Sequence, residues 1–99
     1  MNNMKLVEQN LQTVTEKSVD MLKALAHPIR LQIVRYLISC KISNVTQIQT
    51  QLDIPQSTVS VHLAKLKSTK VLKSERRGLE MYYQVADNTA VDIVTLLCN

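Results

Sequence analysis

Aromatic, chain-breaking and thiol residues are scarce in this sequence. Its 99 residues contain no Trp, no Phe, one Gly, two Pro and two Cys. Without large aromatic rings, the core must be built from Leu, Ile, Val, Met and Ala. So few Gly and Pro residues leave few interruptions, which predicts a mainly helical fold. Two cysteines are too few for a disulfide framework, which excludes the class of small disulfide-stabilised domains.

Long hydrophobic runs and catalytic motifs are absent as well. No segment approaches the roughly 18–20 apolar residues of a membrane span, and the first residues lack the apolar stretch of a signal peptide. We therefore expect a cytoplasmic protein without a membrane partner, folded as one domain over residues 1–99. Because no acid pair, phosphate-binding glycine loop or nucleophile–base pair is present, we expect neither an enzyme nor a cofactor.

The positive charge is confined to one part of the chain. The formal net charge is +4, and the whole excess lies in residues 56–80, which contain six basic and two acidic residues. The rest of the chain contains six of each and is neutral. A basic segment on a neutral body predicts a polyanionic partner, with nucleic acid ahead of anionic lipid. The alternative interpretation is a solvated surface patch.

The first and last predicted helices, residues 5–26 and 88–97, suggest contacts between two copies of the chain. Apolar positions in the first helix recur in alternating steps of four and three residues, as in a coiled coil. The last helix is more apolar than one small core needs, and so short a chain gains stability from a partner subunit. We expect a homodimer contacted through Val7, Leu11, Val14, Val91, Val94 and Leu97. The alternative is that the first helix packs only on its own core.

Between these ends, turn and capping signals predict a helix-turn-helix followed by a hairpin. The His27-Pro28 pair breaks the first helix, and the next helix runs to about residue 40. Asn44 and Gln47 predict a capping box at the start of a short helix, with Ser43-Asn44 opening it. Pro55 begins a further helix that ends near residue 68, and strands over 71–76 and 80–85 surround Arg77-Gly78-Leu79. Residues 44–68 and 71–85 thus predict a winged helix-turn-helix, mainly α with a small β-hairpin.

The polar face of the predicted helix 55–68 suits the major groove of DNA, which is wide enough to admit a helix. Gln56 can bond to an adenine edge, and Ser57 and Ser60 can each donate or accept. Val61 suits a thymine methyl group. We therefore expect these four residues to read bases, the alternative being a solvated helix face.

Phosphate groups are the expected partners of a second set of polar and basic residues. Helix N-termini, amides and hydroxyls bind phosphate, and arginines at a hairpin tip reach the adjoining backbone or minor groove. These residues are Asn44, Thr46, Gln47, Thr58, His62, Lys65, Arg76 and Arg77.

From Leu22 to Val85 the chain resembles the ArsR/SmtB winged-helix repressors of bacteria. The matching segments are Leu22–Val34, Gln56–Leu63, Arg76–Gly78 and Tyr82–Tyr83. The resemblance implies a homodimer joined through its first and last helices, which binds a near-palindromic site in double-stranded DNA and blocks transcription. It also implies that Gln56, Ser57, Ser60 and Val61 occupy the base-reading positions of the family.

The chain departs from the family pattern at the metal sites and at the junction before the hairpin. Metal-sensing members carry Cys-Val-Cys in the short helix, where this chain has Asn44-Val45-Thr46, and amides and hydroxyls cannot replace thiolates. Thr89 stands near a histidine ligand of other members. We therefore expect no metal site and interpret His27 and His62 as local hydrogen-bonding residues. Lys70 replaces a frequent Gly, and we expect it to contact phosphate.

Two alternative functions stay open at this stage. Cys40 and Cys98 would allow a thiol-redox-responsive repressor, since some family members form a disulfide between the second helix and the C-terminal region. Cys40 lies downstream of the usual site, however. A winged helix can also serve as a protein-interaction module, although a basic hairpin and a Ser- and Gln-rich helix favour DNA.

Overall fold

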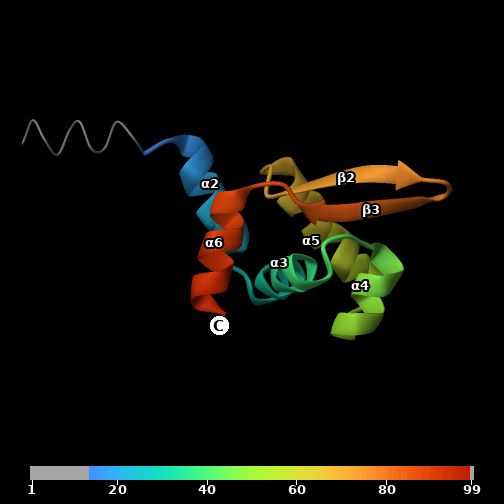
Figure 1. Cartoon of the computed structure of the whole chain (residues 1–99). Helices are drawn as coiled ribbons and strands as arrows, with labels where there is room; N and C mark the ends of the chain where they lie inside the picture. Colours follow the sequence, from blue (N-terminus) through green and yellow to red (C-terminus); the bar gives the residue numbers. More distant parts are fainter. Residues whose placement is uncertain (1–13, 99) are drawn as a thin grey trace, which may run out of the picture.

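Five helices and three short strands make up residues 14–98, the part of the chain that the computed structural model describes (Figure 1). In chain order they are α2 (Glu16–Leu25), α3 (Pro28–Cys40), β1 (Ser43–Asn44), α4 (Val45–Leu52), α5 (Gln56–Ser68), β2 (Leu72–Arg77), β3 (Glu80–Val85) and α6 (Asn88–Leu97). Helices α2 and α6 lie at one end, and the β2–β3 hairpin, here called the wing, extends at the other (Figure 1). The predicted winged helix-turn-helix is confirmed, with a third strand added.

The core is aliphatic, as the composition predicts, and α3 and α5 supply its centre. Its fully buried residues include Ile33, Val34 and Leu37 of α3, Ile48 of α4, and Val59, Leu63 and Leu66 of α5. Their spacing of three and four residues places each set on one face of its helix. Because α5 buries this face against α3 and α4, its opposite face is directed to solvent.

Helix α2 begins later than the single helix predicted over residues 5–26. Thr15 is extended, with φ −104° and ψ 158°, and its Oγ1 accepts a hydrogen bond from the Ser18 N–H at 3.1 Å. A side chain that caps the first turn in this way marks a helix start. The prediction of one continuous helix through Thr15 is therefore wrong. Val7 and Leu11 of the predicted dimer contact lie outside the described residues.

The capping box predicted at Asn44 and Gln47 is present. Asn44 Oδ1 accepts from the Gln47 N–H at 2.8 Å, and Gln47 Oε1 accepts from the Asn44 N–H at 3.0 Å. Ser43 and Asn44, interpreted as the opening of the helix, instead form β1 and pair with Tyr83 and Tyr82 of β3. A two-residue strand has no periodicity of its own, so only its partner strand reveals it.

Strand β2 has the predicted length but lies one residue later in the chain, at Leu72–Arg77 in place of residues 71–76, and β3 has the predicted bounds. The two strands pair from Leu72 opposite Val85 to Arg77 opposite Glu80, which leaves a two-residue loop at the tip. Gly78, the first loop residue, has a φ of 65°, as predicted for the turn. A positive φ at this first position is typical of the type II′ hairpin turn.

Both ends of α5 have distinctive caps. Pro55, predicted as its first residue, has ψ 143° and is the N-cap, and no side chain caps the helix there. At the other end, the Val71 N–H donates to the Leu66 carbonyl at 3.0 Å. The Lys70 N–H donates to the Lys67 carbonyl, also at 3.0 Å. These two bonds form a Schellman motif, whose left-handed residue is usually Gly; here it is Lys70, with φ 67°.

Helix α6 begins at the predicted Asp87 cap, whose Oδ1 accepts from the Thr89 N–H at 2.8 Å. Val94, predicted to contact a second copy, is fully buried in the core of its own chain, which corrects that assignment. Val91 is half-buried and Leu97 is exposed. None of the helices between residues 14 and 98 has the length and hydropathy that a bilayer crossing requires.

We predict that Lys70→Gly stabilises the protein. Gly adopts a positive φ without the steric cost of a Cβ atom, and the expected gain in the free energy of unfolding is roughly 0.5–1 kcal/mol. Urea denaturation followed by circular dichroism measures this gain. Lys70→Ala is the matched control, because it removes the same charge and keeps the Cβ. An equal gain in both variants would show that the charge, and not the backbone conformation, is responsible.

Candidate nucleic-acid interface

Helix α5 carries the four predicted base-reading residues on its exposed face. Gln56, Ser57 and Ser60 are exposed, and the Val61 side chain is 66% exposed. All four lie in the first two turns. Because no side chain caps α5, the N–H groups of its first turn also remain for an external acceptor. Short side chains and unused donors allow the start of α5 to approach a polar, anionic surface closely.

A groove joins the start of α5 to the start of α4 and to the wing. It is lined by Asn44, Val45, Thr46, Gln56, Leu79, Glu80, Met81 and Tyr83. Three elements that are separated in the sequence therefore form one continuous surface. Leu79, at the tip of the wing, is 97% exposed and projects beyond the protein body.

Asn44 does not have the free side chain that a phosphate contact requires. It is only 7% exposed, its Oδ1 caps α4, and its Nδ2 donates to Glu80 Oε2 at 3.0 Å. Because these contacts lie within the fold, the predicted phosphate role of Asn44 is corrected. Thr46 and Gln47 are exposed, and their phosphate contacts stay predictions.

The remaining predicted phosphate contacts differ in exposure. The basic side chains of Lys65, Lys70, Arg76 and Arg77 are exposed, whereas Thr58 and His62 are half-buried. Arg77 is held in place on the wing, because its Nε donates to Glu75 Oε1 at 2.8 Å. Its Cζ also lies 5.2 Å from the centroid of the Tyr82 ring, within the range of a cation–π interaction. The wing therefore presents a positioned guanidinium.

His62 contacts neighbouring helices from within α5. Its Nδ1 lies 3.3 Å from Nη1 of Arg30, and its ring centroid is 4.4 Å from that of His27. The His27 Nδ1 accepts from the Ile29 N–H at 3.1 Å and so caps α3. Both histidines thus make local hydrogen bonds, as predicted. Burial lowers the pKa of His62, and the nearby charges of His27 and Arg30 lower it further.

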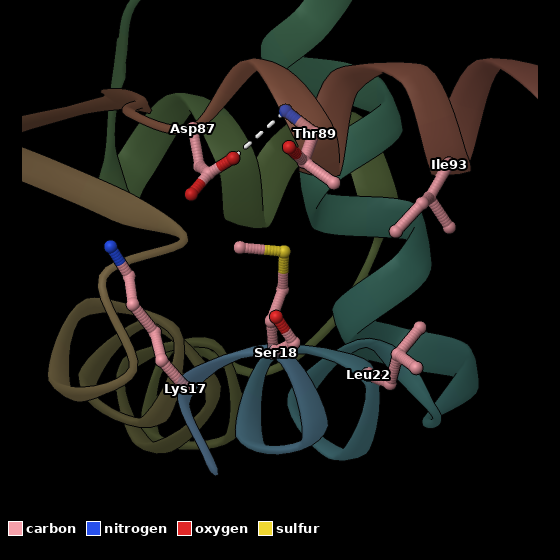
Figure 2. Close-up of a pocket in the computed structure, with 7 residues that line it drawn as sticks. Lys17, Ser18, Leu22, Asp87, Thr89 and Ile93 are labelled. Atoms are coloured by element: carbon pink, nitrogen blue, oxygen red, sulfur yellow. Dashed lines mark hydrogen bonds between the residues drawn. The ribbon is translucent and has the colours of Figure 1, made fainter. Parts of the chain in front are cut away.

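The end of the molecule opposite the wing has a hollow between α2 and α6 (Figure 2). Its volume is about 390 Å³, and it is lined by Lys17, Ser18, Met21, Leu22, Asp87, Thr89 and Ile93. Figure 2 shows Leu22 of α2 and Ile93 of α6 on the same side of this hollow. Large exposed apolar side chains on the same two elements and next to them are Val14, Val19, Leu22, Leu96 and Leu97. Apolar patches of this kind on small proteins mark interaction surfaces.

Cys40 and Cys98 are free thiols, and both are half-buried. The C-terminal end of α3 shares a hollow with the first turn of α6, lined by Leu37, Ile38, Lys41, Gln84, Val85, Asn88 and Val91. Cys98 follows the last turn of α6, whose ten residues span about 15 Å from the first turn. A disulfide requires Cα atoms within about 7 Å. Both thiols are free in the structure, and the length of α6 gives no support to a bond between them within one chain.

The fold, the exposed start of α5 and the basic wing define a winged helix-turn-helix protein. A family model described as "Bacterial regulatory protein, arsR family" matches residues 27–72. Transcriptional repressor PagR of Bacillus anthracis is 49% identical over 82 residues, which are 83% of this chain and 82% of PagR. The chain belongs to the arsR family of bacterial transcriptional regulators, and the family resemblance of its sequence is confirmed.

Solved structures of family members match the fold. The crystal structure of PagR superimposes with a TM-score of 0.78 at 48% identity and covers 83% of this chain and 93% of that chain. Reduced HlyU of Vibrio cholerae gives 0.82 at 26% identity, with 92% and 99% covered. The homodimeric winged helix-turn-helix domain of Mb0332 from Mycobacterium bovis gives 0.73 at 29% identity, with 83% and 75% covered.

Sequence reasoning missed Glu80 and Tyr82, which connect the wing to the start of α4. The Tyr82 hydroxyl lies 3.5 Å from Asn44 Nδ2 and donates to Glu80 Oε2 at 3.4 Å. Their separation by two residues on a predicted strand places both side chains on one face of the sheet. That spacing was a usable signal, but β1, which brings Asn44 to this face, was not predicted.

We predict that acidification destabilises the protein partly through His62. Its pKa is lower in the folded chain than in the unfolded chain, so the unfolded state binds a proton more readily below the ordinary histidine pKa. The contribution of His62 to the free energy of unfolding is therefore fully present above about pH 6.5 and is lost as the pH falls below that value. Urea midpoints at pH 7.5 and 5.5 should differ less for His62→Gln than for the unsubstituted protein. Identical pH dependence in the two proteins would contradict this assignment.

Proposed function

We propose that this protein is a sequence-specific transcriptional repressor that binds a near-palindromic site in double-stranded DNA as a homodimer. The observation that carries the proposal is the exposed polar start of α5 beside a basic wing, in a chain whose whole charge excess lies in residues 56–80. A bacterial regulator of this kind acts in the cytoplasm, where the DNA is. PagR, which is similar over 83% of the chain, is itself named a transcriptional repressor.

In this proposal α5 enters the major groove with its N-terminal turns facing the bases. Gln56 has the donor and acceptor needed for an adenine edge, and Ser57 and Ser60 are short enough for close approach. Val61 adds an apolar contact. The flanking phosphates fix the register of the helix on the duplex. They are contacted by Thr46, Gln47, Thr58, His62, Lys65, Lys70, Arg76 and Arg77.

A dimer places two copies of α5 on successive turns of one duplex, which is why the site is near-palindromic. The exposed apolar side chains on and beside α2 and α6 support pairing at the end opposite the wing; among them, Leu22 of α2 is 54% exposed and Leu97 of α6 is 69% exposed. Covering them removes apolar surface from water, at about 25 cal/mol per Å². The homodimeric Mb0332 domain has the same fold.

We expect Gln56→Ala and Ser60→Ala to relax sequence preference. Each change removes a base contact, so affinity for the best site should fall by about 1–3 kcal/mol while affinity for unrelated DNA changes little. Duplexes selected from a random pool supply the best site, and fluorescence anisotropy measures the affinities.

Arg76→Ala is the contrasting variant. It should weaken binding to all sequences alike and flatten the slope of log affinity against log salt concentration. Affinity that does not change with salt would contradict phosphate contacts and would favour the alternative function as a protein-interaction module.

We expect Leu97→Glu to give monomers, because the charge would be buried at the proposed contact. Leu97 is exposed within one chain, so the circular dichroism spectrum should stay the same. Light scattering with size-exclusion chromatography gives the mass. Leu79→Glu is the matched control, since it makes the same change at an exposed leucine on the wing and should leave the dimer intact. A dimeric Leu97→Glu protein would refute this interface.

A further inference from the structure

We propose that Glu80 and Tyr82 are positioning residues that hold the wing against the start of α4, and that DNA affinity depends on this attachment. The second half of the statement rests on the proposed function. The first half concerns the free protein and is tested without DNA.

The attachment is a small hydrogen-bonded cluster around the Asn44 amide. Asn44 Nδ2 donates to Glu80 Oε2 at 3.0 Å and lies 3.5 Å from the Tyr82 hydroxyl. That hydroxyl donates to the same Glu80 oxygen at 3.4 Å. Because Asn44 is only 7% exposed and also caps α4, its amide has a fixed orientation. The wing is therefore attached to the residue that caps α4.

The cluster continues into the core. Gln47 Oε1, which accepts from the Asn44 N–H, also accepts from the Ser43 hydroxyl at 3.1 Å. The Ser43 hydroxyl lies 3.3 Å from the Tyr36 hydroxyl of α3, and Ser43 is 1% exposed. One connected set of hydrogen bonds thus runs from α3 through the start of α4 to the wing. Connected hydrogen bonds of this kind make the elements that they join more rigid.

In the other direction, the cluster positions a cation on the wing. The ring of Tyr82 supports the Arg77 guanidinium, which is 5.2 Å from the ring centroid. Register pairs Tyr82 with Glu75, the carboxylate to which Arg77 donates. If the Tyr82 ring moves, the platform beneath Arg77 moves with it.

The charge of Glu80 distinguishes positioning from direct DNA contact. A carboxylate beside the starts of α4 and α5 repels phosphate, so its charge alone lowers affinity for a polyanion. Any favourable contribution of Glu80 to DNA affinity must therefore come from the hydrogen bond that it accepts from Asn44. Charge and hydrogen bond are separable, because Gln has the same shape and retains an acceptor oxygen, whereas Ala has none.

Glu80→Gln and Glu80→Ala remove the same charge, and only Gln can still accept from Asn44. Against a duplex selected by the unsubstituted protein, Glu80→Gln should bind at least as tightly as that protein. Glu80→Ala should bind roughly threefold to tenfold more weakly than Glu80→Gln. Tyr82→Phe, which keeps the ring beneath Arg77 and loses the hydroxyl, should be weakened to a smaller extent and serves if Glu80→Ala does not fold.

Amide hydrogen exchange without DNA provides the second readout. Exchange in β1 and the wing should be faster in Glu80→Ala and unchanged in Glu80→Gln, with α6 as the internal reference. Equal exchange in the two variants overturns the attachment, and equal affinity overturns its role in binding. If the exchange rates differ as expected but the unsubstituted protein selects no duplex, the attachment stands and the proposed DNA-binding function fails.

Discussion

Burial of one stripe of α5 is the constraint on which the rest of this structure depends. Val59, Leu63 and Leu66 are fully buried, and no Trp or Phe is available to fill the core in their place. Aliphatic side chains fill a small core only if helices pack closely, so the orientation of α5 is fixed by α3 and α4. The polar face of α5 then points outward because the apolar face points inward. Stability and recognition are thus two results of a single helix orientation.

Polar contacts add what apolar packing cannot provide, which is a fixed place for the wing. A hairpin is marginally stable by itself, and this wing has only the inner ends of its strands against the core. Asn44 caps a helix and binds the wing through its side-chain amide, and its backbone takes part in a strand pair. The function of one buried polar residue therefore cannot be assigned from its type alone: Asn44 has the amide of a phosphate ligand and acts within the fold.

Most of the fold could be predicted from the sequence, because apolar spacing and capping residues are local signals. The helix of residues 88–97, the break at His27-Pro28 and the turn at Gly78 follow from such signals. β1 could not be predicted, because two residues carry no period and their pairing with Tyr82 and Tyr83 is a tertiary contact. Val94 was misassigned for a similar reason, since hydropathy shows that a residue is apolar but not which surface covers it. The exposed residues of the site were predictable from helix periodicity, and the contacts of Asn44, Glu80 and Tyr82 were not.

The guanidinium of Arg30 connects the end of α2 to α5. It donates to the Ala24 carbonyl at the end of α2 and lies against His62 of α5, so one planar side chain connects the two helices. Only the two residues Ala26 and His27 separate α2 from α3, and the His27 ring also rests on His62. No flexible linker therefore separates the position of α2 from that of α5. In a pair of chains joined at α2, these short and direct contacts would fix the distance between the two copies of α5. Such a dimer would therefore bind only sites whose half-sites are separated by a small range of distances.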